Sequence, residues 1–309
     1  MTDYRTTSVP VSGGQLAVGT WNSDATHATQ LLAIHGITAS HLAWPLVADR
    51  LAGTRVIAPD LRGRARSNSL PPPWGIRNHA DDMAAVLDGF GVERVVVVGH
   101  SMGGFVAVRF AAQHPDRVAS LVLVDGGLPL PTLQGVPDRE LPARLLGPAG
   151  ERLSRVFPNR ESYESSWRSH PAFVGHWSRA VGDYADYDLD EVPGGFRPSS
   201  NYDAIAANIV QLSGDDGYRE ALAGLTVPVT FLRAPRGLLN EEPPLNPPEV
   251  VHAAQRLAPQ LTVFDAHDVN HYTIVMAPEG ADQVARLVRP ALSAAAEDRH
   301  ALPPRISGR

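Results

Sequence analysis

The chain opens with an alternation of apolar and polar residues from Val9 to Trp21, interrupted by Ser12-Gly13-Gly14. Alternation with a period of two places every second side chain on one face of a strand, and adjacent glycines permit a tight turn. The pattern predicts an N-terminal β-hairpin.

Short apolar runs then alternate with segments of helical periodicity. Strands are predicted at 30–34, 54–60, 95–98 and 118–125, and helices at 44–52, 76–90 and from the glycine-rich segment at 99–104 to about Gln113. The four consecutive valines Val95 to Val98 have no polar alternation, which is typical of a central strand buried on both faces. This order predicts a mostly parallel, doubly wound sheet, in which the carboxyl ends of the parallel strands lie on the same side.

The strand pattern stops at Gly126 and resumes near Gly224. Between them prolines and aromatic residues lie among helical fragments, which indicates a helical insertion. Beyond it, strands are predicted at 227–232 and 261–264 and helices at 248–257 and 278–292. We therefore expect an α/β core formed by 1–126 and 225–296, a helical cap at 127–224 inserted after the strand that ends at Asp125, and a disordered tail at 297–309.

The amino-acid composition and net charge exclude several classes of function. Of the 309 residues, 43 % are hydrophobic and 19 % charged, as in ordinary globular proteins. The formal net charge of −6, with no basic patch, argues against a nucleic-acid partner. The chain has no cysteine, which excludes disulfides and thiolate nucleophiles. No apolar run approaches the ~20 residues that span a bilayer, so we expect a cytoplasmic protein with no membrane partner.

The sequence Gly99-His100-Ser101-Met102-Gly103 is a G-x-S-x-G pattern between a predicted buried strand and a predicted helix. A serine on such a turn is strained and exposed, and the flanking glycines are needed because a Cβ would clash there. The start of the following helix also stabilises negative charge. The pattern predicts a nucleophile at Ser101; the alternative is a glycine-rich turn that carries an uninvolved serine.

Three further segments accompany this turn: His35-Gly36-Ile37 after an early strand, 60–67 with the sequence DLRGRARS, and 269–272 with the sequence VNHY. Together they resemble the α/β-hydrolase fold family over about residues 7 to 296. The resemblance implies Ser101 as nucleophile, His271 as general base, and the backbone N–H groups of Ile37 and Met102 as oxyanion-hole donors. Ala65 departs from the pattern, because the family usually has glycine there.

The residues also argue for His271 on chemical grounds. A serine hydroxyl is a weak nucleophile near pH 7 and needs an adjacent base, for which histidine is suited. Among the twelve histidines, only His271 lies in a short loop after the last predicted strand. We expect His35 and His100 to form local hydrogen bonds instead.

The acid that completes a triad is less obvious. Most of the family places it after the strand that follows the insertion, but 231–242 contains no aspartate. Asp125 ends a predicted strand 24 positions after Ser101, and some related dehalogenases and lactonases have their acid there. Asp125 could instead only cap the next turn, and Glu241 and Glu242 are the alternative acids.

Metal and cofactor signals are weak. His267 and His271 have the spacing of a helical metal clamp, but they lie in a predicted loop with no third ligand. The acidic run from Asp183 to Glu191 has glutamate where a calcium loop requires glycine, so we expect a solvated face. No nucleotide-binding pattern occurs. We expect no metal and no cofactor.

These observations predict a serine hydrolase that cleaves a small apolar or aromatic ester or a lactone through an acyl-enzyme. Trp167, Phe173 and Trp177 in the cap are expected to roof the substrate pocket or to pack the cap core. Alternatives are hydrolysis of a carbon–carbon bond, a cofactor-free perhydrolase, and a non-catalytic small-molecule receptor. The substrate and the oligomeric state stay open.

Overall fold

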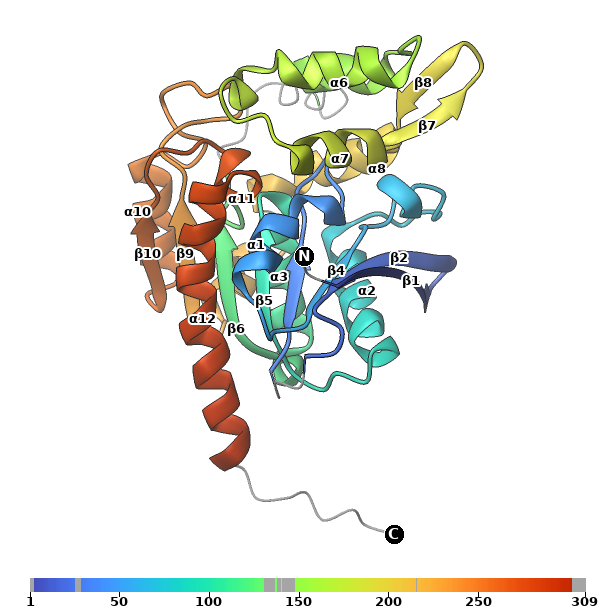
Figure 1. Ribbon diagram of the computed structural model, residues 1–309. Helices are drawn as coiled ribbons and strands as arrows, with labels where there is room; N and C mark the ends of the chain where they lie inside the picture. Colours follow the sequence, from blue (N-terminus) through green and yellow to red (C-terminus); the bar gives the residue numbers. More distant parts are fainter. Residues whose placement is uncertain are drawn as a thin grey trace.

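An eight-stranded sheet forms the centre of the computed structural model, which describes residues 3–25, 29–130, 137, 140, 148–214 and 216–301 (Figure 1). In spatial order the strands are β1 (Tyr4–Val11), β2 (Gly14–Trp21), β4 (Val56–Pro59), β3 (Leu31–Ile34), β5 (Val95–His100), β6 (Val118–Val124), β9 (Val229–Arg233) and β10 (Leu261–Asp265). The pairs β1–β2 and β2–β4 are antiparallel, and all other pairs are parallel. The predicted N-terminal hairpin and mostly parallel sheet are confirmed.

The central strand β5 is buried on both faces, as its four valines predict. Val95 and Val97 pack into one apolar core, whereas Val96 and Val98 pack into a second core on the opposite face. Because successive side chains of a strand point to opposite faces, one short apolar run supplies both cores.

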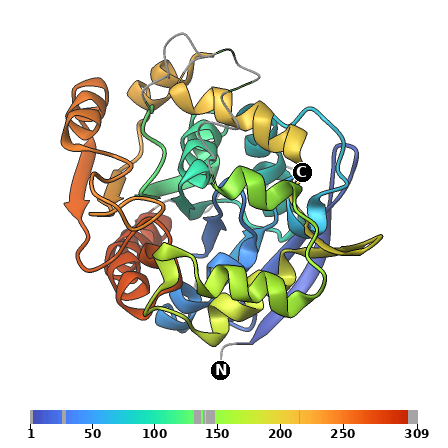
Figure 2. The same cartoon turned by 90° about the horizontal axis from the view of Figure 1, so that it is seen from above.

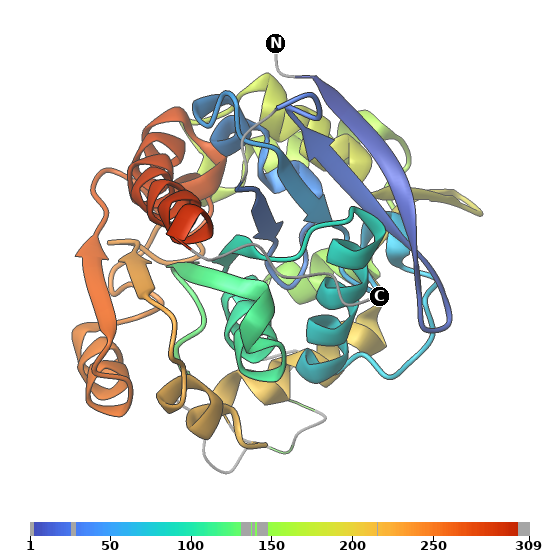
Figure 3. The ribbon, with the colours of Figure 1, turned by 90° about the horizontal axis from the view of Figure 1, so that it is seen from below.

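Helices cover both faces of the sheet. One layer contains α2 (Ile76–Gly89) and α3 (Met102–Gln113), and the other contains α1 (Pro45–Arg50) and α12 (Pro278–Ala301), as Figure 3 shows from below. The remaining helices of the core are α10 (Pro248–Leu257) and α11 (Thr273–Met276). Short 3-10 turns occur at η1 (His41–Ala43), η2 (Ala65–Ser67) and η3 (Pro115–Arg117).

Most of the insertion between β6 and β9 lies above the ends of the sheet strands (Figures 1 and 2). It contains α5 (Pro148–Ser154), α6 (Arg160–Arg168), η4 (Pro171–Phe173), α7 (Arg179–Tyr187), β7 (Leu189–Val192), β8 (Gly195–Pro198), α8 (Tyr202–Ile209), η5 (Val210–Ser213) and α9 (Tyr218–Ala223). The antiparallel pair β7–β8 corrects the expectation of a purely helical insertion. Its strands have only four residues each, too few for alternation to be recognised in the sequence.

A buried carboxylate connects the insertion to the sheet. Asp60, directly after β4, accepts hydrogen bonds from the backbone N and Nδ1 of His41, both at 2.8 Å, and from the Tyr187 hydroxyl at 2.7 Å. Contacts with His41 lower the pKa of Asp60 although burial opposes this. The end of α7 is thereby attached to the core.

The C-terminal helix is longer than predicted. Helix α12 continues to Ala301, so the expectation that the chain is disordered from Glu297 is wrong for 297–301. Residues 302–309 lie outside the described residues. Five alanines from Ala291 to Ala301, both included, favour the extension, because alanine has the highest helix propensity. No helix within the described ranges is long and apolar enough to cross a membrane.

Candidate active site

Ser101 occupies a strained turn between β5 and α3. Its backbone has φ +54° and ψ −124°, and its N–H donates to the Val124 carbonyl of the neighbouring strand at 3.0 Å. A Cβ on Gly99 would lie 2.3 Å from the Gly103 carbonyl oxygen, and one on Gly103 would lie 2.1 Å from the Ile34 carbonyl oxygen. The glycines of the motif are therefore required by close backbone approach.

The loop after β3 lies against this serine. A Cβ on Gly36 would be 3.2 Å from the Ser101 Cβ, so the Gly36 backbone itself lies directly against the Ser101 side chain. His35 fixes the loop: its Nε2 accepts from Leu61 N at 2.9 Å, which leaves Nδ1 to donate to the Gly36 carbonyl at 2.7 Å. Burial lowers the pKa of His35 to about 4, so the ring is neutral. The expected local role of His35 agrees with these contacts.

His271 lies between β10 and α11, and its Nδ1 is 2.7 Å from Asp125 Oδ2. A carboxylate can only accept, so Nδ1 carries the proton and Nε2 is left with a lone pair. The His271 N–H donates to the Arg236 carbonyl at 3.1 Å, and its carbonyl accepts from His100 Nε2 at 2.8 Å. The backbone of this histidine is thus held from both sides.

Asp125 follows β6 with φ +45° and is completely buried. Its second oxygen, Oδ1, accepts from Asn246 Nδ2 at 3.0 Å and from Ala234 N at 3.2 Å. These two bonds orient the carboxylate toward His271. Asn246 was not foreseen from the sequence, since it lies in a proline-rich loop without a recognisable motif.

The two alternative acids point elsewhere. Glu241 is exposed and accepts from Leu239 N at 2.6 Å, and Glu242 forms an ion pair with Arg236 at 3.1 Å. His271 has its carboxylate contact with Asp125 alone among the described residues. The geometry favours Asp125, and its catalytic role remains a prediction.

The imidazole ring of His100 lies beside that of the candidate base, tilted by 37°. The two imidazole centroids are 4.7 Å apart, and burial followed by the proximity of His271 lowers the pKa of His100 far below its usual value. A neutral His100 can hold the His271 backbone without adding positive charge beside its ring.

Comparison with known proteins supports the fold described above. A family model for the alpha/beta hydrolase fold matches residues 30–164. The crystal structure of E-2-(acetamidomethylene)succinate hydrolase superposes with a TM-score of 0.74 at 22 % identity, covering 94 % of this chain and all of that one. The chain has the α/β-hydrolase fold.

Two other proteins are similar to this chain. Lipase LipV of Mycobacterium tuberculosis is 45 % identical over 101 residues, which are 33 % of this chain and only 38 % of the lipase. A thioesterase domain from the curacin biosynthetic pathway superposes with a TM-score of 0.73 at 25 % identity, covering 93 % of this chain and 99 % of that domain.

A small cavity of about 40 Å³ adjoins Ser101 and His271. Its described lining is mainly apolar or backbone and comprises Gly36, Ile37, Thr38, Ala39, Ala43, His100, Ser101, Tyr184, Leu238, His271, Tyr272, Val275 and Met276. The lining does not include Trp167, Phe173 or Trp177. Trp167 and Phe173 are instead buried in the cap core, with ring centroids 6.0 and 5.5 Å from that of Tyr272.

Tyr184 and Tyr272 are cavity residues that the sequence analysis missed. Tyr272 directly follows His271 in the VNHY segment, which could have drawn attention to it. Tyr184 lies on α7, and its hydroxyl donates to the Thr38 carbonyl at 3.4 Å. Only the folding of the cap onto the loop after β3 brings it to the site.

No cluster of three or more His, Asp or Glu side chains within the described residues could hold a metal ion. The acidic run in the cap is not a uniform solvated face, which corrects that expectation. Asp188 is buried and bonded to Tyr163 and, at 3.2 Å, to Arg152 Nη1 and Ser199 Oγ.

Ala65 has φ +44°, a left-handed conformation that favours glycine. This explains why glycine is usual in the family at that position.

Proposed function

We propose that this α/β-hydrolase is a serine hydrolase that cleaves a carboxylic ester or a lactone through an acyl-enzyme. The observation that carries the proposal is the 2.7 Å contact between His271 Nδ1 and Asp125 Oδ2 beside the strained Ser101 turn. Such a contact fixes the histidine tautomer that a serine nucleophile requires.

In the proposed reaction, Ser101 Oγ attacks the acyl carbon while His271 Nε2 takes its proton. The carbonyl oxygen becomes negative, and the N–H groups of Met102 and Ile37 would stabilise it at the start of α3. When the tetrahedral intermediate collapses, the bond to the leaving oxygen breaks and His271 returns its proton to that oxygen. A water molecule then hydrolyses the acyl-enzyme by the same steps; with a lactone, the released hydroxyl stays on the acyl chain.

The dimensions of the site favour a small acyl group. A cavity of about 40 Å³ holds only a few heavy atoms, because one water needs about 10–15 Å³ of such cavity space. Its side walls are Ala39, Val275 and Met276, which offer no charge to a polar substituent. We therefore expect acetyl and propionyl esters to be better substrates than long-chain esters.

The test has two parts. A fluorophosphonate probe should label Ser101, identified by peptide mass spectrometry, and Ser101→Ala should abolish labelling and lower turnover by about 10⁶. With p-nitrophenyl esters from acetate to octanoate and a parallel series of lactones, kcat/KM should fall beyond about four acyl carbons. Labelling at another residue, or an active Ser101→Ala variant, would refute the proposal; a preference for octanoate would refute only the acyl size.

A further inference from the structure

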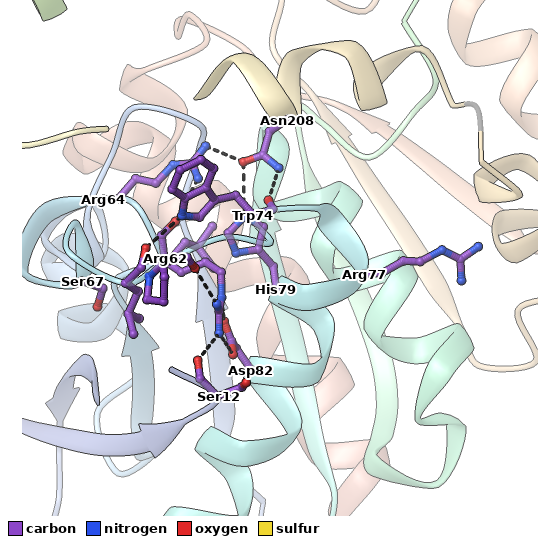
Figure 4. A network of polar contacts seen from close by, with 12 residues as sticks. Ser12, Arg62, Arg64, Ser67, Trp74, Arg77, His79, Asp82 and Asn208 are labelled. Carbon is purple, nitrogen blue, oxygen red and sulfur yellow. Dashed lines mark hydrogen bonds and ion pairs between the residues drawn. The ribbon is translucent and has the colours of Figure 1, made fainter. Parts of the chain in front are cut away.

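Arg64 is a completely buried cation on the loop between β4 and α2. Its guanidinium donates to the Ile37 carbonyl at 2.9 Å and to the Arg62 carbonyl at 3.0 Å. It also donates to Asn208 Oδ1 at 2.6 Å (Figure 4). None of the ion pairs found among the described residues includes Arg64. Burying a charge that only neutral acceptors contact is costly, so Arg64 requires a reason beyond packing.

The neighbouring Arg62 shows the contrast. It is also buried, but its Nε and Nη2 donate to the two oxygens of Asp82 at 2.6 and 2.7 Å (Figure 4). The charge of Arg62 is therefore compensated, while that of Arg64, two residues later on the same loop, is not.

The uncompensated charge lies directly behind the proposed oxyanion hole. Arg64 touches both residues whose N–H groups would form that hole, through the Ile37 carbonyl and, at 3.8 Å, through the Met102 Sδ. Its positive potential is one of the causes, after burial, that lower the pKa of His35 to about 4. Burial lowers the pKa of Arg64 itself to about 9, so the side chain is protonated at neutral pH.

We propose that Arg64 is a positioning residue of the oxyanion hole, which fixes the Ile37 peptide and whose uncompensated charge favours the negative charge formed on the substrate oxygen. This inference rests on the proposed function. Preorganised positive potential in a site without water is effective because nothing must reorient when the charge develops. Arg64 transfers no proton and contacts no reacting atom.

The cap completes this arrangement. Asn208 on α8 accepts from Arg64 and, at 3.2 Å, from His79 Nε2, and its own Nδ2 donates to the Trp74 carbonyl at 2.6 Å (Figure 4). A Cβ on Gly63 would lie 2.4 Å from the Ala204 Cβ, so α8 packs directly on the arginine loop. Asn208 thus supplies an oriented acceptor that adds no negative charge.

Two substitutions of Asn208 separate charge from anchoring. Asn208→Asp keeps an oxygen for Arg64 but compensates its charge, whereas Asn208→Ala removes the oxygen and adds no charge; both lose the bond to Trp74. At pH 8 we expect kcat for a p-nitrophenyl ester to be at least tenfold lower in Asn208→Asp than in Asn208→Ala, with similar KM. The affinity for a trifluoromethyl ketone, which forms a tetrahedral adduct with the serine, should fall by the same factor.

An anchoring role predicts the reverse order. If Asn208→Asp is as active as Asn208→Ala or more so, the role of the charge is refuted.

Direct substitution of Arg64 gives a second readout. Arg64→Met should lower kcat, and Arg64→Lys should restore part of it. The control Arg62→Lys should lower the melting temperature but leave kcat unchanged. If Arg64→Met does not fold, the Asn208 pair decides.

Labelling distinguishes the two proposals. Failure of the fluorophosphonate probe to label Ser101 in the unmodified protein refutes the proposed function. Labelling of Ser101 together with full activity of Asn208→Asp refutes only the role of Arg64.

Discussion

Asp125 illustrates how a single residue is prepared for its proposed role. One carboxylate oxygen accepts from Asn246 and Ala234, and the other faces His271 Nδ1. Because both oxygens have partners and the side chain is buried, the carboxylate has one orientation. Glu241 and Glu242 lack this support, since each is exposed and bonded within its own loop.

The first prediction follows from this geometry. Asp125→Asn should lower kcat by about 10⁴, because an amide favours the wrong histidine tautomer. Glu241→Gln and Glu242→Gln should lower it less than tenfold. Steady-state kinetics with p-nitrophenyl acetate and circular dichroism of each variant provide the measurement. A folded, nearly fully active Asp125→Asn would mean that Asp125 is only a strand-end residue.

At the scale of elements, polar contacts from several elements of the cap join it to the core. Besides Asn208, they include Tyr187 at the end of α7, bonded to Asp60, and Asp190 of β7, which accepts from Arg66 at 3.0 Å and from Asn68 at 2.5 Å. Helix α7 also carries Tyr184 into the cavity. The attachment of this one helix therefore affects both stability and substrate binding.

Tyr187→Phe tests that attachment. Loss of a hydrogen bond to a buried carboxylate should lower the free energy of unfolding by about 1.5–3 kcal/mol. We also expect KM to rise with kcat little changed, because Tyr184 shifts while Ser101 and His271 stay in place. Tyr202→Phe on the exposed surface of α8 is the matched control. Equal denaturation midpoints and equal KM for both variants would contradict this prediction.

At the scale of the whole molecule, several histidines are held neutral inside the fold. The pKa of His35 and that of His170 are lowered to about 4, and those of His79 and His100 are lowered well below the usual value, in each case mainly by burial. In the unfolded chain an ordinary histidine titrates near ~6.5. As pH falls below that value, these histidines bind protons in the unfolded state but not in the folded state, so the free energy of unfolding decreases.

The fold should therefore lose stability between about pH 6.5 and 4, with His35 alone accounting for about 3 kcal/mol. Urea unfolding at pH 8, 6 and 5 measures this loss. His170→Gln should reduce the pH dependence, whereas His252→Gln, at an exposed position of α10, should not. Constant stability from pH 7 to 4.5 would show that these side chains are not held neutral.

The sequence by itself determined the order of strands and helices, the Ser101 turn, and His271 as the histidine of the last loop. These features depend on neighbours along the chain: alternation, helical spacing, and glycines that permit a sharp turn. The two differences found in the structure, the β7–β8 pair and the longer α12, are also local: they concern only where a strand or helix begins and ends.

Only the tertiary structure decided which side chains meet. Asp125 and His271 are 146 positions apart, and Arg64 and Asn208 are 144 apart. No local pattern distinguishes Asp125 from Glu241, because the choice depends on which strand ends bring a carboxylate to the histidine. Likewise, an arginine in a loop is ordinarily exposed, and only the packing of α8 against the loop after β4 buries Arg64 without a carboxylate partner.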